Sequence, residues 1–188
     1  MAYYERKLPH WQPDGAAIFL TWRLHGSLPK EVLEQRLDQE PSSRRFLRWD
    51  RALHAAATGP TWLKDPSVAA CIVSALHYGE SALKLYELRA WVIMSDQVHL
   101  FINPQAPLAR INRSVRGFSA QEANRRLARA GPFWQQESYD HWSRSGEESA
   151  RIIRYIETNP VQAGLADRPE AWPWSSAAWG KPPGLPSG

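Results

Sequence analysis

The sequence predicts an α+β fold in which one antiparallel sheet carries helices on one face. Three observations lead to this prediction. Short segments alternate apolar and polar residues as half-buried strands do, longer segments repeat apolar residues at helical spacing, and the segments follow one another as strand, helix, strand, strand, helix, strand. That order is the ferredoxin-like split βαβ arrangement, to which an extra C-terminal helix carrying a tyrosine is added.

The expected strands are short and lie between turn-forming residues. Because side chains alternate along a strand, the first one should divide its residues into two faces: Ile18, Leu20 and Trp22 on one, and Phe19, Thr21 and Arg23 on the other. We expect strands over residues 16–24, 84–94, 97–103 and 138–144.

Helices are expected over residues 66–78 and 108–129, and again around Tyr155. Asp65 before Pro66 is typical of an N-cap followed by the first helical residue. Pro160 should end the last helix at Asn159, because its ring disfavours the helical conformation in the residue before it. Residues 1–180 should form one domain with a charged helical insertion over 30–60, and residues 181–188 a disordered tail.

The stretch from Trp91 to Pro104, WVIMSDQVHLFINP, predicts a strand, a polar turn and a second strand. Gln97 and His99 should share one face of the second strand, with Val98 packed behind them. An imidazole and an amide oxygen side by side could hold a divalent metal. A half-buried strand with a hydrogen-bonded histidine is the alternative, and Asp96 is interpreted as a turn residue or a supporting partner.

The stretch RIIRYIETNPVQAG, residues 151–164, predicts a helix whose apolar stripe is formed by isoleucines at helical spacing. Tyr155 and Asn159 are four residues apart and therefore lie on one face. A phenol and an amide so placed could serve one site, the first as nucleophile and the second as ligand. Spacing alone favours the alternative, an ordinary helix with a half-buried tyrosine and a C-terminal asparagine.

Taken together, these blocks resemble the REP-associated tyrosine transposases, a branch of the single-tyrosine HUH transposases. The likeness covers nearly the whole chain, through LPHWQPDGAAIFLTWRLHGSLP, WVIMSDQVHLFINP, SVRGFSAQEANRRL, FWQQESYDHWSR, RYIETNPVQAGL and WPWSSA. In that family the strand turn reads Met-Pro-Asn-His-hydrophobic-His, the two histidines bind a divalent metal, and the tyrosine of a Tyr-Ile-x-x-Asn-Pro helix attacks DNA. The resemblance implies that His99 is the second histidine, Tyr155 the nucleophile and Asn159 the third metal ligand.

The chain departs from the family pattern at the metal site. Gln97 stands where the family has its first histidine, and Ser95-Asp96 replaces the preceding Pro-Asn. A glutamine oxygen can bind Mg²⁺ or Mn²⁺ but is a weaker, neutral donor, so the metal affinity should fall. Two interpretations follow: a metal-dependent transposase that cleaves and joins single-stranded hairpin DNA, or a catalytically impaired hairpin-binding or regulatory protein on the same fold.

The charge of the chain favours an anionic partner. Its net charge is +4 and its pI about 9.4. The helix expected over 108–129 carries arginines that could follow a DNA backbone or simply form a solvated face: Arg110, Arg113, Arg116, Arg125 and Arg126. His141, in the block YDHWSR, could contact DNA or support the site. Tyr139 is a rival nucleophile, ranked lower because the resemblance aligns the family tyrosine with Tyr155.

The remaining composition narrows the class of protein. The single cysteine, Cys71, excludes an intramolecular disulfide and a multi-cysteine zinc site. Most of the ten tryptophans should serve packing, although some could stack on unpaired bases. With neither a secretory signal nor an apolar run long enough for a membrane helix, we expect a cytoplasmic monomer or homodimer that binds single-stranded or hairpin DNA and no membrane.

Overall fold

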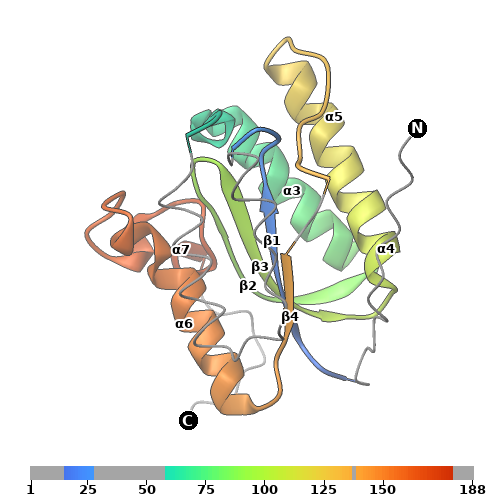
Figure 1. The fold of residues 1–188 in the computed structure, drawn as a ribbon. Helices are drawn as coiled ribbons and strands as arrows, with labels where there is room; N and C mark the ends of the chain where they lie inside the picture. The colour runs from blue at the N-terminus through green and yellow to red at the C-terminus, as the bar shows by residue number, and fades with distance from the viewer. Residues whose placement is uncertain (1–14, 28–57, 137–138, 180–188) are drawn as a thin grey trace.

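A four-stranded antiparallel sheet forms the centre of the protein (Figure 1). The structure is a computed structural model and describes residues 15–27, 58–136 and 139–179. The strands are β1 (Ile18–Arg23), β2 (Tyr86–Ile93), β3 (Gln97–Pro104) and β4 (Tyr139–Trp142), in the spatial order β2-β3-β1-β4. This is the order of the split βαβ arrangement, so the predicted fold class is confirmed and β3 is a central strand.

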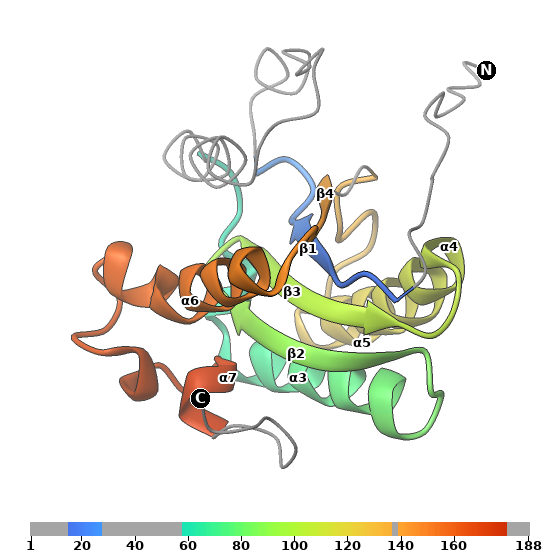
Figure 2. The ribbon, with the colours of Figure 1, turned by 90° about the horizontal axis from the view of Figure 1, so that it is seen from below.

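Helices cover both faces of the sheet (Figure 2). One face carries α3 (Pro66–Ser81) and a continuous helical segment made of α4 (Leu108–Ile111), the π-helical η2 (Asn112–Arg116) and α5 (Gly117–Arg126). The extra C-terminal helix α6 (Gly146–Gln162) lies on the opposite face. The short elements η1 (Trp62–Lys64), η3 (Pro169–Ala171) and α7 (Ser176–Trp179) complete the described part. None of the helices in this part is both long and apolar enough to cross a membrane.

The two faces of the sheet bury different kinds of side chain. Toward α3 and α5 the core is apolar, with β1 contributing Ile18, Leu20 and Trp22 as the alternation predicts. Toward α6 a smaller apolar cluster contains Phe19, Phe101 and Tyr155. The α6 face also buries a row of polar residues, which register and alternation place on one side: Thr21, Arg23, Gln97, His99 and His141. Buried polar groups concentrated on one face mark that face as the candidate functional one.

Helix α3 begins where the sequence predicts. The Asp65 carboxylate accepts a hydrogen bond from the Ser67 amide at 2.8 Å, and Pro66 is the first helical residue. Hydrogen bonding by Ser67, through its side chain first and its amide second, holds the pKa of Asp65 below its usual value. The helix extends to Ser81 rather than Tyr78, and the Ala82 amide still bonds to the Tyr78 carbonyl at 3.0 Å. Cys71 is buried within it, and burial raises the pKa of its thiol.

The predicted end of the last helix at Asn159 is wrong. Helix α6 continues through Pro160 to Gln162. Beyond its C-terminus, Gly164 has a φ of +68°, and two bonds close the last turn: the Gly164 amide to the Val161 carbonyl at 3.0 Å and the Leu165 amide to the Pro160 carbonyl at 2.8 Å. A proline in the last turn removes one helical hydrogen bond, and the closing bonds together with burial of Pro160 offset that loss.

The structure adds two departures from regular geometry that the sequence analysis did not predict, a π-helical turn and a register shift within a strand. The segment expected over 108–129 ends its helix at Arg126 and contains the π-helical turn, where the Trp22 indole N–H donates to the Asn112 side-chain oxygen at 3.1 Å. Strand β2 contains a register shift between Leu88 and Ala90. The predicted insertion, apart from residues 58–60, and the predicted tail lie outside the described residues.

Gly79 allows α3 to lie close to β2, and this contact can be tested. The buried Tyr86 hydroxyl donates to the Leu76 carbonyl at 2.8 Å, and a Cβ on Gly79 would lie 2.5 Å from that hydroxyl. Gly79→Ala should therefore lower the free energy of unfolding by about 1–3 kcal/mol through overpacking. Urea denaturation measures the loss.

Gly117→Ala is the matched control, because Gly117 is also helical and a Cβ there meets nothing within 4 Å. It should be neutral or stabilise by up to about 1 kcal/mol. Equal urea midpoints for wild type and Gly79→Ala would contradict the close contact between α3 and β2.

Candidate functional site

The turn between β2 and β3 is tied to the end of β1. The Leu24 amide donates to the Asp96 carbonyl at 2.9 Å, and the Met94 amide donates to the Gln97 carbonyl at 2.8 Å. The Asp96 carboxylate lies 4.0 Å from the Arg23 guanidinium, and both side chains are almost completely buried. Asp96 is therefore a turn residue with an ionic partner, and that pairing balances the buried charge beside Gln97.

His99 is hydrogen-bonded through both ring nitrogens. Its Nδ1 lies 3.0 Å from the Thr21 hydroxyl, and its Nε2 lies 3.1 Å from the Gln97 amide nitrogen. Since an amide nitrogen can only donate, His99 Nε2 accepts and Nδ1 carries the proton that is donated to Thr21. With the Gln97 amide in this orientation, His99 is the tautomer protonated at Nδ1, and its Nε2 lone pair is directed at Gln97.

Tyr155 packs directly against this histidine. Its ring centroid lies 5.8 Å from that of His99 and 6.2 Å from that of Phe19, and Phe19 stacks on His99 at 5.4 Å. Helix α6 supplies Tyr155 from the α6 face of the sheet, so the structure brings Gln97, His99 and Tyr155 together. Tyr155 is only 3% exposed.

Asn159 lies one helical turn after Tyr155 on the same buried stripe of α6. Among the hydrogen bonds of the described residues, none joins its amide to Gln97 or His99. The four predicted site residues thus share one face of the sheet, and contacts link three of them.

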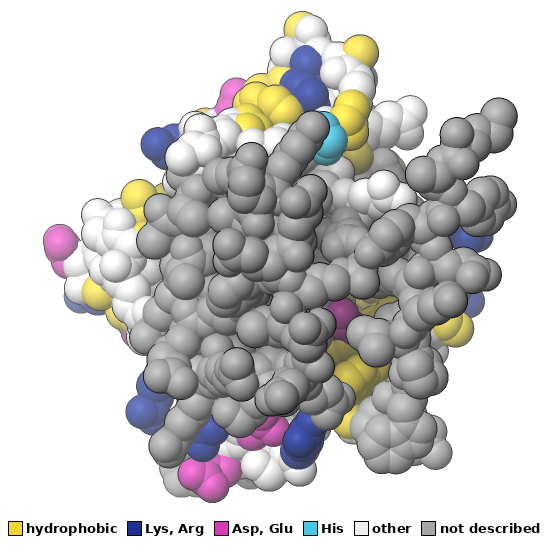
Figure 3. Space-filling model, viewed as in Figure 1, with side chains coloured by type: hydrophobic (Ala, Val, Ile, Leu, Met, Phe, Trp, Pro, Cys, Tyr) yellow, Lys and Arg dark blue, Asp and Glu magenta, His cyan; other side chains and the backbone are white. Residues whose placement is uncertain are grey.

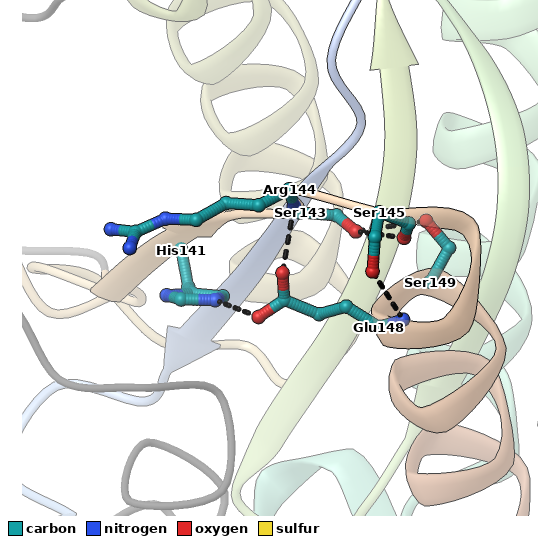
Figure 4. A network of polar contacts seen from close by, with 6 residues as sticks. All are labelled: His141, Ser143, Arg144, Ser145, Glu148 and Ser149. Carbon is teal, nitrogen blue, oxygen red and sulfur yellow. Dashed lines mark hydrogen bonds and ion pairs between the residues drawn. The ribbon is translucent and has the colours of Figure 1, made fainter.

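His141 lies on β4 opposite Phe19 and is also buried on the α6 face. Its Nε2 is 2.9 Å from a carboxylate oxygen of Glu148 in the first turn of α6. This contact supports the connection from β4 to α6 (Figure 4). The supporting role that the sequence analysis considered for His141 therefore has a geometric basis.

The five predicted DNA-binding arginines have unlike surroundings. Arg110 and Arg113 are exposed, whereas the half-buried Arg116 donates to the Gln135 carbonyl. Arg125 and Arg126 flank Glu122 at 2.8 Å and 4.0 Å. The Arg125 hydrogen bond holds the pKa of Glu122 below its usual value. These contacts favour the first two arginines as the ones presented to an anionic partner.

Charge elsewhere on the surface is mixed in sign. At the N-terminal end of α6, acidic and basic side chains lie close together (Figure 3), and Glu147 pairs with Arg151 at 3.4 Å. Exposed ion pairs of this kind contribute little to stability.

Three features of the site were not found from the sequence. Thr21 orients His99, Arg23 balances Asp96, and Glu148 holds His141. Each contact joins segments that are distant in the chain or lie on different elements. Strand register places Thr21 opposite His99 and Arg23 opposite Gln97, whereas the first turn of α6 brings Glu148 to His141. The spacing of Ser145 and Glu148 is nevertheless the pattern of a helix capping box.

The residues present fit a divalent metal if the Gln97 amide turns over. In the described ranges no three His, Cys, Asp or Glu side chains cluster closely enough to hold a metal ion, so amide oxygens would have to contribute. Adjacent ligands of an octahedral Mg²⁺ lie about 3 Å apart. The 3.1 Å between Gln97 and His99 matches this spacing once the amide oxygen replaces the nitrogen. Thr21 bonded to Nδ1 is the kind of outer support that metal-binding histidines have.

Comparison with known proteins adds information about the fold. No model of a known protein family matches the chain, and neither does any curated protein. A solved REP-associated tyrosine transposase bound to a REP hairpin is similar with a TM-score of 0.56 and 16% identity, over 95% of this chain and 84% of that one. A protein from Deinococcus radiodurans R1 that is provisionally assigned as a transposase has a TM-score of 0.34 and 18% identity, over 81% of this chain and 96% of that one. At 16% identity, the first likeness establishes a shared α+β fold.

The hydrogen bond from the Gln97 amide to His99 Nε2 predicts the tautomer in which Nδ1 donates to Thr21. Thr21→Val keeps the shape of the side chain but removes the acceptor for the Nδ1 proton, so it should lower the free energy of unfolding by about 1–3 kcal/mol. Thr21→Ser keeps the hydroxyl and should therefore lower the free energy of unfolding by less than Thr21→Val does. Two-bond ¹H–¹⁵N NMR of the wild type should find His99 protonated at Nδ1, and a proton at Nε2 would contradict this assignment.

Proposed function

We propose that this chain cleaves and joins single-stranded DNA at hairpins or palindromic repeats, with Tyr155 as the nucleophile. The observation that carries the proposal is the contact of Tyr155 with His99, which in turn bonds to Gln97, on the one sheet face that buries polar residues. The fold shared with a tyrosine transposase whose structure contains a REP hairpin supports it. Hairpin DNA is therefore the proposed partner.

The chemistry requires a phenolate and charge neutralisation at phosphorus. The Tyr155 oxygen would attack the phosphorus, forming a 5′-phosphotyrosine while the bond to the 3′ oxygen breaks. The 3′ oxygen takes up a proton, and the phenol loses one. A free phenol has a pKa of about 10, so it needs help to ionise at neutral pH. The covalent link stores the energy of the broken bond, so rejoining needs no ATP.

A divalent metal, Mg²⁺ or Mn²⁺, is the proposed cofactor. His99, Gln97 and Asn159 would hold it through one imidazole nitrogen and two amide oxygens. When bound, it would neutralise charge on the non-bridging phosphate oxygens and favour the phenolate. The chain itself contributes the orientation of His99, through Thr21, and the packing of the Tyr155 ring against the stacked rings of His99 and Phe19.

A second candidate function is hairpin binding or regulation without cleavage. It is favoured by the hydrogen bond in which the Gln97 amide occupies the His99 Nε2 lone pair, the donor that a metal would need. Histidine at position 97 could instead share a metal with His99. The two candidates make the same prediction for hairpin binding and opposite predictions for covalent chemistry.

One experiment separates these two candidates. The chain is incubated with labelled single-stranded hairpin DNA and Mn²⁺, and covalent adducts are resolved by denaturing electrophoresis. The wild type should form an adduct, and Gln97→His should raise Mn²⁺ affinity and adduct formation about tenfold or more, because imidazole is the stronger donor. Hairpin affinity should change little.

Tyr155→Phe in either background should abolish the adduct, while Tyr78→Phe, at an exposed position, should not. If wild type reacts as fast as Gln97→His, glutamine is a working ligand. If neither reacts while both bind hairpins, the chain is a binding protein and the nuclease proposal fails.

The proposed DNA surface can be tested through salt. Replacing Arg110 and Arg113 together by alanine should reduce the slope of log affinity against log salt by about 1.4–1.8, because each lost phosphate contact accounts for about 0.7–0.9. Fluorescence anisotropy with a labelled hairpin measures the slope.

Arg125 and Arg126 are the matched control pair, because Glu122 already offsets their charge. Their double alanine variant should change the slope less. An unchanged slope for Arg110 and Arg113 would place the DNA contacts elsewhere.

A further inference from the structure

The connection from β4 to α6 is held by hydrogen bonds along its length (Figure 4). The Ser143 amide donates to the Ala17 carbonyl at 2.8 Å, and its hydroxyl lies 2.8 Å from that of Ser149. The Ser145 hydroxyl caps α6 by accepting from the Glu148 amide at 3.1 Å. The helix therefore leaves the sheet in a defined direction.

Glu148 adds a contact that capping does not require. One carboxylate oxygen accepts from the Arg144 amide at 2.7 Å, and the other lies 2.9 Å from His141 Nε2. Both side chains are nearly buried, at 8% and 11% exposure. Hydrogen bonds to a carboxylate are stronger than neutral ones. We call the pair Glu148 and His141 the α6 anchor, because it ties the first turn of the helix to strand β4.

The α6 anchor and Tyr155 lie on the same stripe of one helix. The buried residues of α6 toward the sheet follow helical spacing: Glu148, Ile152, Tyr155, Ile156 and Asn159. Seven residues, about two turns or ~10 Å, separate Glu148 from Tyr155. A rotation or tilt of the helix at Glu148 therefore moves the phenol relative to His99.

The other half of α6 is held by a second, weaker contact. The Ser176 hydroxyl donates to the Glu157 carboxylate at 3.3 Å and accepts from the Trp91 amide at 3.2 Å. With one contact on each side of Tyr155, the helix is fixed at two points. The shorter and more buried contact is the one at the α6 anchor.

From this arrangement we infer that Glu148 and His141 are positioning residues, which set the direction from which the Tyr155 hydroxyl approaches the scissile phosphate. The inference rests on the proposed function of Tyr155. Displacing a nucleophile by about 1 Å can cost about 100-fold in rate. Loss of the α6 anchor should therefore slow covalent adduct formation without weakening hairpin binding.

The test compares five variants in the full chain. Glu148→Ala and His141→Leu remove the contact, while Glu148→Gln and His141→Gln keep a hydrogen-bonding group. Glu147→Ala is the matched control, because it removes the same charge from the first turn of α6 at a side chain that is 86% exposed. Adduct formation with hairpin DNA and Mn²⁺, hairpin affinity and thermal unfolding are measured for each.

An additional readout does not depend on activity. The chain has six tyrosines, and 3-fluorotyrosine labelling gives each a ¹⁹F resonance. The line missing in Tyr155→Phe identifies Tyr155. Its shift reports the surroundings of the phenol in the α6 anchor variants.

We expect Glu148→Ala and His141→Leu to move the Tyr155 resonance and slow the adduct about tenfold or more, with hairpin affinity within about twofold. Glu148→Gln and His141→Gln should recover part of the rate, and Glu147→Ala should match wild type. An unmoved resonance in the folded Glu148→Ala and His141→Leu variants overturns the inference, even if the rate falls. If wild type forms no adduct, the proposed function fails, and the resonance alone decides whether the α6 anchor places Tyr155.

Discussion

The position of β3 between β1 and β2 constrains the rest of the structure. A central strand is buried on both faces, so its alternate residues must suit two different environments. Val98, Leu100 and Ile102 enter the apolar core under α3 and α5, while Gln97 and His99 face α6. Burying two polar side chains on a central strand is costly unless they are hydrogen-bonded. The bonds to Thr21 and between the two side chains satisfy both ring nitrogens of His99 and the amide nitrogen of Gln97.

The candidate site is assembled from parts of the chain that are far apart. Strand β1 provides Thr21 and Phe19, strand β3 provides Gln97 and His99, and helix α6 provides Tyr155. The strands are fixed by the sheet ladder, so their side chains have little freedom. Helix α6 has no such ladder and depends on end contacts and apolar packing. Its placement is the most sensitive element of the geometry.

Local patterns in the sequence predicted the parts of this site that depend on periodicity. Alternation placed Gln97 with His99, and helical spacing placed Tyr155 with Asn159. The contact of Thr21 with His99 crosses 78 residues and depends on strand register, which no local pattern encodes. The predicted end of the helix at Asn159 was wrong because a proline normally breaks a helix. Here the closing bonds of the last turn compensate for the hydrogen bond that Pro160 removes. The sequence also cannot predict whether the Gln97 amide donates to His99 or accepts from it, because that depends on the surroundings of the amide in the folded protein.

The burial of Tyr155, only 3% exposed, bears on which DNA the proposed enzyme would act upon. A hidden nucleophile reacts only in the fraction of molecules whose site has opened, so the observed rate is the intrinsic rate multiplied by that fraction. A strand whose binding favours the open state would react faster without any better contact at the phosphate. While the open state is rare, every 1.4 kcal/mol by which a strand binds the open state more tightly than the closed state raises the observed rate about tenfold. The enzyme would then distinguish hairpins by how strongly each one favours the open state. Single strands that do not favour the open state would react slowly.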